Sequence, residues 1–136
     1  MTTTLQKLAT VFGIVLTLLA IVGAFAAGAM YMQPTDPAMA SKALGIFPVN
    51  LLHNILHLLS GLWGLAAARS WGSAKSFFVW GGVIYAALTV LAFVSPTGFG
   101  LVPLAGPDIA LHCLVAIVML GIGLTAKPVA SDTQAV

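Results

Sequence analysis

Charged residues are scarce in this sequence, at 6% of 136 residues, whereas soluble domains carry about 25%. Hydrophobic residues make up 60% of the chain. A water-soluble fold of this composition would have almost no polar side chains left for its surface. The composition therefore excludes a soluble globular domain and favours an integral membrane protein, and the length allows one compact bundle.

Cysteine and clustered positive charge are also nearly absent. The formal net charge is +2, which is too small and too dispersed for a nucleic-acid-binding surface. The single cysteine, Cys113, excludes an intrachain disulfide and a metal site built from several thiolates. Because Cys113 lies within an apolar run, we expect it to be a small core residue rather than a nucleophile.

Long uncharged apolar segments are what the sequence does contain. A helix needs roughly 20 apolar residues to cross the hydrocarbon core of a bilayer. We interpret the first segment as a retained helix, because it exceeds the apolar region of about 7–15 residues in a signal peptide. The sequence predicts an all-α integral membrane protein, a four-helix antiparallel bundle with helices at about 8–32, 48–68, 76–95 and 108–126.

The positive charges predict how this bundle is oriented, because cytoplasmic loops carry an excess of lysine and arginine. We expect residues 1–127 to form the transmembrane domain, with both termini in the cytoplasm, and residues 128–136 to be a disordered polar cytoplasmic tail. Four of the five cationic residues fall on the expected cytoplasmic side, namely Lys7, Arg69, Lys75 and Lys127, with Lys42 on the outer side.

The most informative polar residues are His53 and His57, which lie four apart in a run of leucines. Side chains at this spacing share one face of a helix, and polar groups inside a membrane are costly and usually functional. Asp108 and His112 repeat the spacing in the last segment, and His53 and His112 each follow a proline at the same interval. We therefore predict two similarly oriented hairpins and one cluster in the outer half of the bilayer: Asn50, His53, Asn54, His57, Asp108 and His112.

Several interpretations of this cluster remain open. It can be a hydrogen-bonded staple between helices, with Asn50, Asn54 and Asp108 as its structural polar groups and with Asn50 and Asp108 also capping their helices. It can be a route for protons, although no acidic or basic group continues such a path through the inner half.

Two further interpretations involve a cofactor. A metal ion can be held by His53, His57, Asp108 and His112, because imidazole suits zinc, copper, nickel and iron. A haem or chlorophyll-type pigment can be held axially by His53, His57 and His112.

A resemblance extends over residues 45–124 and is carried by three motifs. These are Val49-Asn50-Leu-Leu-His53-Asn54-Ile-Leu-His57, then Gly81-Gly82-Val-Ile-Tyr85, then Gly100-Leu-Val-Pro103 with Asp108 and Leu111-His112. They resemble a family of small bacterial four-helix membrane proteins catalogued as domain of unknown function four-three-eight-three. The resemblance implies a multi-pass protein of the bacterial cytoplasmic (inner) membrane and supplies no established activity.

Our leading hypothesis from the sequence is a non-enzymatic structural or accessory subunit of a larger membrane complex. Its expected partners are the lipid bilayer and either another membrane protein or further copies of the same chain. The alternative is a cofactor-binding or redox protein that uses His53, His57 and His112.

Overall fold

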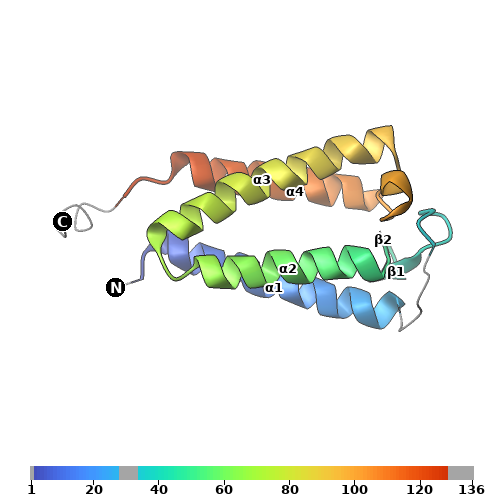
Figure 1. Ribbon diagram of the computed structural model, residues 1–136, viewed down its shortest axis with the longest axis horizontal. Helices are drawn as coiled ribbons and strands as arrows, with labels where there is room; N and C mark the ends of the chain where they lie inside the picture. The colour runs from blue at the N-terminus through green and yellow to red at the C-terminus, as the bar shows by residue number, and fades with distance from the viewer. Residues whose placement is uncertain (1, 28–33, 129–136) are drawn as a thin grey trace.

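The computed structural model describes residues 2–27 and 34–128. Its helices are α1 (Thr4–Ala27), α2 (Leu51–Ala67), α3 (Trp71–Val94) and α4 (Pro107–Thr125), with a short 3-10 turn η1 (Gly98–Gly100) and two strands, β1 (Ser41–Ala43) and β2 (Phe47–Val49). The four long helices lie side by side along the long axis, and the start of α1 and the end of α4 lie at the same end of the bundle (Figure 1). The predicted all-α four-helix antiparallel bundle is confirmed.

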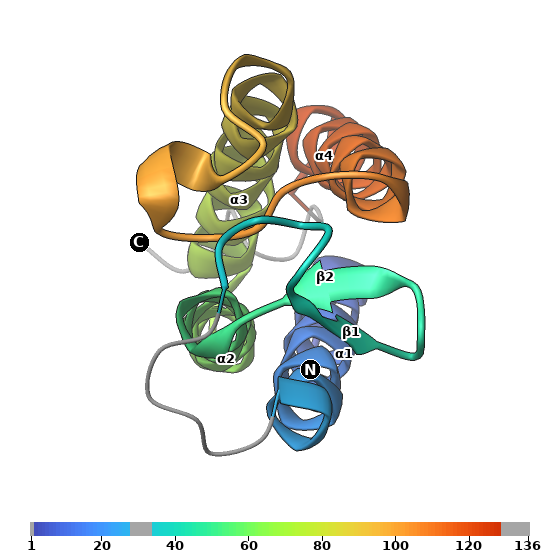
Figure 2. The same cartoon turned by 90° about the vertical axis from the view of Figure 1, so that its right-hand side faces the viewer.

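The lengths and apolar surfaces of the helices are those of a membrane protein. Three of them, α1, α3 and α4, are long and apolar enough to cross a membrane. At 1.5 Å per residue, the 24 residues of α1 and of α3 measure about 36 Å, against about 30 Å of hydrocarbon. The 17 residues of α2 measure only about 26 Å, and the hairpin of β1 and β2 lies next to the N-terminal end of α2 (Figure 2).

The bundle is built from two helical hairpins, with α1 packed on α2 and α3 packed on α4. Glycines let the backbones meet within each hairpin. A Cβ on Gly13 would lie 2.7 Å from the Leu65 amide nitrogen, and a Cβ on Gly123 would lie 2.8 Å from the Val79 amide nitrogen. Small residues allow this close approach in lipid, where no hydrophobic drive joins helices. The two hairpins run in the same direction (Figure 1), as the repeated proline–histidine spacing predicts.

The expected starts of two helices are wrong, because both helices begin before their apolar runs, in segments that contain a charged residue. α1 begins at Thr4 rather than residue 8, while the expected end at residues 28–32 lies outside the described residues. α3 begins at Trp71 rather than residue 76, because the Ser70 hydroxyl caps it by accepting the Ser73 N–H at 3.1 Å. Lys75 fits inside that helix, since its ammonium donates to the Ala126 carbonyl at 3.3 Å.

The segment before α2 also differs from the expectation. Pro48 belongs to β2 and pairs with Lys42 of β1, so α2 begins at Leu51 rather than residue 48. The turn between the strands places Leu44 and Gly45 at positive φ values of 51° and 77°. No hairpin was predicted there, because the strands are only three residues long and the turn lacks a typical hairpin sequence.

The apolar core lies towards the end of the bundle that holds the termini, and polar residues occupy the interior at the other end. Phe77 and Phe78 are at most 1% exposed and pack edge-to-face, with ring centroids 5.3 Å apart. Cys113, in contrast, is exposed on α4, so its expected place in the core is wrong. Consecutive side chains on a helix point about 100° apart. Because His112 points into the bundle, Cys113 points away from it.

Candidate histidine site

Asn50 sets the start of α2 and therefore the position of both histidines on it. Its side-chain oxygen accepts the His53 N–H at 2.9 Å, so the predicted cap of this helix is confirmed. Its amide nitrogen donates to the Leu101 carbonyl at 2.8 Å. The same side chain thus ties the start of α2 to the segment that precedes α4.

The start of α4 brings an aspartate and a histidine to the same depth. Gly106 precedes the helix at a φ of 63°, and Pro107 occupies its first turn, where a missing N–H costs nothing. Asp108 does not cap the helix by hydrogen bonding, contrary to the expectation. It is 2% exposed and points along the helix, with Oδ2 3.5 Å from Nδ1 of His112. The helix dipole favours a carboxylate at this end of a helix.

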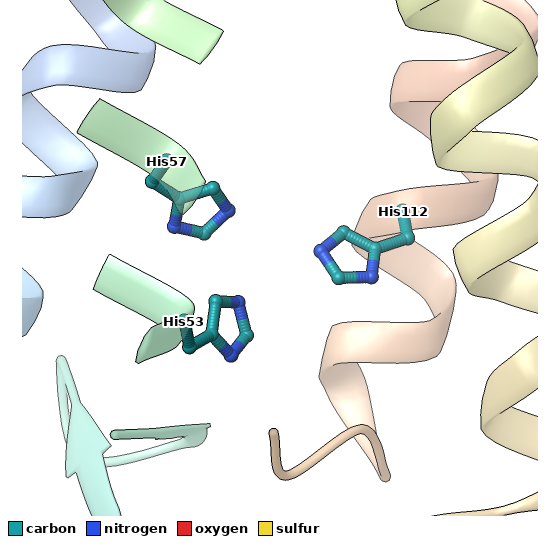
Figure 3. Close-up of side chains that lie close together, drawn as sticks. All are labelled: His53, His57 and His112. Atoms are coloured by element: carbon teal, nitrogen blue, oxygen red, sulfur yellow. The ribbon is translucent and has the colours of Figure 1, made fainter. Parts of the chain in front are cut away.

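The three histidines of the chain converge between α2 and α4. The ring centroids of His53 and His57 are 4.7 Å apart, and those of His53 and His112 are 5.8 Å apart. Each ring offers one nitrogen, and these nitrogens all lie within 4.8 Å of one another. In Figure 3 one nitrogen of His112 points from α4 towards His53 and His57 on α2.

The imidazoles are buried, and most of their nitrogens lack a hydrogen bond of full geometry. His53, His57 and His112 are 4%, 8% and 2% exposed. Within residues 2–27 and 34–128, no ring nitrogen of His53 or of His112 has a partner that meets the full geometry of a hydrogen bond. Polar groups nonetheless lie close, because the Pro103 backbone faces His53 and Asp108 Oδ2 lies 3.5 Å from His112 Nδ1.

Asn54 takes a different direction from the histidines. It is 4% exposed, and its amide packs on Gly23 of α1, where a Cβ would overlap it. The structure therefore brings Asn54 to the interface between α1 and α2. Asn50 bonds the backbone N–H of His53, Asp108 faces the imidazole of His112, and Tyr85 of α3 lies against the same imidazole.

A cavity of about 170 Å³ lies beside the histidines. Tyr85 of α3 forms part of its wall, with its ring centroid 5.4 Å from that of His112, and Ser60 of α2 forms another part. Neither residue was predicted to belong to the site, although Ser60 follows His57 by three residues, a spacing that places both on one helix face. The available signal for Tyr85 was its place in the Gly-Gly-Val-Ile-Tyr motif. The remaining lining residues are Leu56, Ile84, Leu88, Val102 and Leu104.

Comparison with known proteins identifies the family. No curated protein and no solved structure matches this chain. A family model described as "Domain of unknown function (DUF4383)" matches residues 6–125, which include all four helices almost completely, as well as the three histidines, Tyr85 and Asp108. The chain belongs to this family of proteins with a domain of unknown function, DUF4383.

Proposed function

We propose that this protein binds a transition-metal ion through His53, His57 and His112. The observation that supports the proposal is the convergence of one nitrogen from each imidazole to within 4.8 Å, where neither ring nitrogen of His53 nor Nε2 of His112 has a hydrogen bond of full geometry among the described residues. Buried polar atoms without a partner are rare in proteins, and each one calls for an explanation. A shared metal ion accounts for one nitrogen of each imidazole.

The distances fit such an ion after a small adjustment. Zn–N bonds of about 2.0–2.1 Å at tetrahedral angles place ligand nitrogens about 3.4 Å apart. The nitrogens here lie within 4.8 Å of one another, so the rings need to close by about 1.4 Å at most. Modest rotations about the side-chain bonds supply this movement, since the histidines come from two helices with a cavity beside them.

Asp108 fits the role of a residue that orients a ligand. A metal-bound histidine usually donates its second ring N–H to a carboxylate, which fixes the ring and raises its basicity. Nδ1 of His112 faces Oδ2 of Asp108 at 3.5 Å, which leaves Nε2 for the metal. We therefore assign Asp108 to this second role and leave three protein ligands on the ion.

The same geometry argues against a haem or chlorophyll-type pigment. Sites for drug-sized ligands have volumes of about 300–1,000 Å³, and a tetrapyrrole is larger than most such ligands. The cavity measures only about 170 Å³. A ring bound on the outside of the bundle would need an exposed imidazole, whereas all three are at most 8% exposed. Three imidazoles without a thiolate suit zinc, copper, nickel or iron(II).

The test is metal binding by the full chain, purified in detergent with an affinity tag that contains no histidine. After chelator treatment and buffer exchange, we expect one equivalent of Co²⁺ or Zn²⁺ to bind. His112→Ala should abolish stoichiometric binding, whereas Cys113→Ala, at the adjacent exposed position, should keep it. A wild-type protein that is folded and binds no more metal than His112→Ala would disprove the proposal.

We further propose that the bundle lies in the bacterial cytoplasmic membrane with both termini in the cytoplasm. The support is the charge distribution, because Lys7 and Lys127 flank the end of the bundle that holds the termini. A green fluorescent protein fused to the C-terminus folds only in the cytoplasm and should fluoresce. An alkaline phosphatase fusion at the same position should be inactive, and the reverse pair of results would overturn this orientation.

A role as an accessory subunit is a second proposal, supported by apolar side chains at the outer end. Met39, Leu44, Ile46 and Phe99 are 52–74% exposed there, in segments outside the four helices. Large exposed apolar patches often mark protein contacts. Cross-linking in membranes through cysteines placed at Leu44 and Phe99, in a Cys113→Ala background, should trap one specific partner. Cross-linking only to lipid or to no protein would exclude this contact.

A further inference from the structure

The cavity beside the three histidines is closed towards the outer end of the bundle. Val102 and Leu104, at 6% and 2% exposure, form its cover. That cover is held in place from both sides, because the Leu101 carbonyl accepts the Asn50 amide at 2.8 Å and the Leu104 N–H donates to the Pro96 carbonyl at 2.7 Å. A hydrated solute arriving from the aqueous phase therefore meets a packed apolar segment rather than an entrance.

The opening of the cavity lies on the side, between α2 and α3. Leu56 of α2 and Ile84 of α3 both line the cavity, and both are also exposed on the outer surface of the bundle, at 41% and 49%. These two helices make much less contact with each other than either makes with its hairpin partner, and they diverge towards the outer end (Figure 1). In a membrane, this opening faces lipid.

The size and lining of the cavity indicate what can enter. Its volume of about 170 Å³ is close to that of an engineered apolar cavity of about 150 Å³ that binds benzene. Five of the ten residues that line the cavity are aliphatic, and the other five, which include His57, His112 and Tyr85, carry polar groups. A ligand with a single-ring apolar body and one oxygen at its end matches this division.

We propose that the cavity admits a lipid-dissolved single-ring phenol through the opening between α2 and α3, with its oxygen directed at the histidine-bound metal. This inference rests on the proposed metal site, because three protein ligands leave a coordination position open to an exogenous oxygen. A phenol partitions into lipid and so reaches the opening, and its oxygen is a ligand for zinc, copper or iron. The metal site is thereby a ligand-binding centre that takes its ligand from the bilayer.

The test uses 4-fluorophenol with the full chain in detergent, both free of metal and loaded with Co²⁺. Binding to the loaded protein should change the visible absorption of Co²⁺ and shift and broaden the fluorine resonance through the paramagnetic ion. Ile84→Trp, which narrows the opening, should weaken 4-fluorophenol binding at least tenfold without changing Co²⁺ stoichiometry. Val83→Trp is the matched control, because Val83 is exposed on the same helix but does not line the cavity.

The possible failures are distinguishable. If Co²⁺ does not bind, the proposed metal site is wrong and the coordination of the phenol is wrong with it. If Co²⁺ binds with one equivalent but 4-fluorophenol leaves its absorption unchanged, only the present inference is overturned. Equal weakening by Ile84→Trp and Val83→Trp would exclude the opening between α2 and α3. A spectral change produced by octanoate but not by 4-fluorophenol would assign the site to carboxylates and overturn the phenol class.

Discussion

Asp108→Asn is the substitution that most directly tests how the proposed metal site is organised. The two side chains have almost the same shape, so the change removes a negative charge with little repacking. Loss of a carboxylate that orients a metal-bound histidine typically weakens metal binding by 10–100-fold. The separation of 3.5 Å between Oδ2 and His112 Nδ1 exceeds the 2.7–2.9 Å of a strong charge-assisted hydrogen bond. We therefore expect the lower part of that range, about 10–30-fold, which corresponds to about 1.4–2 kcal/mol.

The assay is competition for Co²⁺ or Zn²⁺ between the full chain in detergent and a chromophoric chelator of known affinity. Asp36→Asn is the control, since Asp36 is exposed in the outer segment and its Oδ1 accepts the Ala38 N–H at 2.9 Å, a bond that asparagine retains. That variant should bind metal as the wild type does. If Asp108→Asn is folded and its dissociation constant lies within twofold of the wild-type value, Asp108 has no role in orienting His112.

Three further predictions concern the fold and the site. Gly13→Ala should destabilise the bundle by about 1–3 kcal/mol, because its Cβ would lie 2.9 Å from the Gly61 carbonyl oxygen. Gly121→Ala, with no atom within 4 Å of the new methyl group, should be neutral or stabilising. Reversible unfolding in mixed micelles measures the stability of both variants, and equal destabilisation by the two would contradict the close crossing of α1 and α2. Asn50→Ala should lower the free energy of unfolding in the same assay by about 1 kcal/mol through loss of the helix cap, whereas Asn50→Ser should retain part of the cap. An unchanged stability of the Asn50→Ala variant would show that the cap contributes nothing. Metal affinity should fall on acidification, because protons compete for the imidazole nitrogens that bind the ion, and a chelator titration at several pH values checks this; an affinity independent of pH would exclude histidine ligands.

Local features of the sequence were sufficient for the helices and for one of their caps. The apolar runs predict four helices because a chain in lipid must satisfy its backbone hydrogen bonds within each segment. The asparagine three residues before His53 predicts the cap of α2, since the interaction needs only neighbouring residues. The predicted start of α3 was wrong because a polar segment, rather than the apolar run, determines it. The helix continues through Lys75 to a serine cap.

Helical periodicity predicted which residues share a helix face better than it predicted which residues contact one another across helices. It correctly placed His53 and His57 on one face of α2 and Asp108 with His112 on one face of α4. The predicted polar cluster also included Asn54, whereas the close approach of α1 at Gly23 takes that amide into another interface. The apolar run around Cys113 suggested a core position, but its place one residue after His112 leaves it on the outer surface of α4.

The sequence by itself determined the membrane class, the four helices, their antiparallel order and the similar level of the three histidines along the bundle, because these properties follow from composition, spacing and the rise of a helix. Only the tertiary structure decided that α2 and α4 turn their histidines towards each other, that Tyr85 and Ser60 join them around a cavity, and that the cavity opens beside Ile84. The physical reason is that spacing along a helix defines a side chain's direction relative to that helix alone. The rotation and separation of two helices depend on where small residues let their backbones meet, here at Gly13 and Gly123.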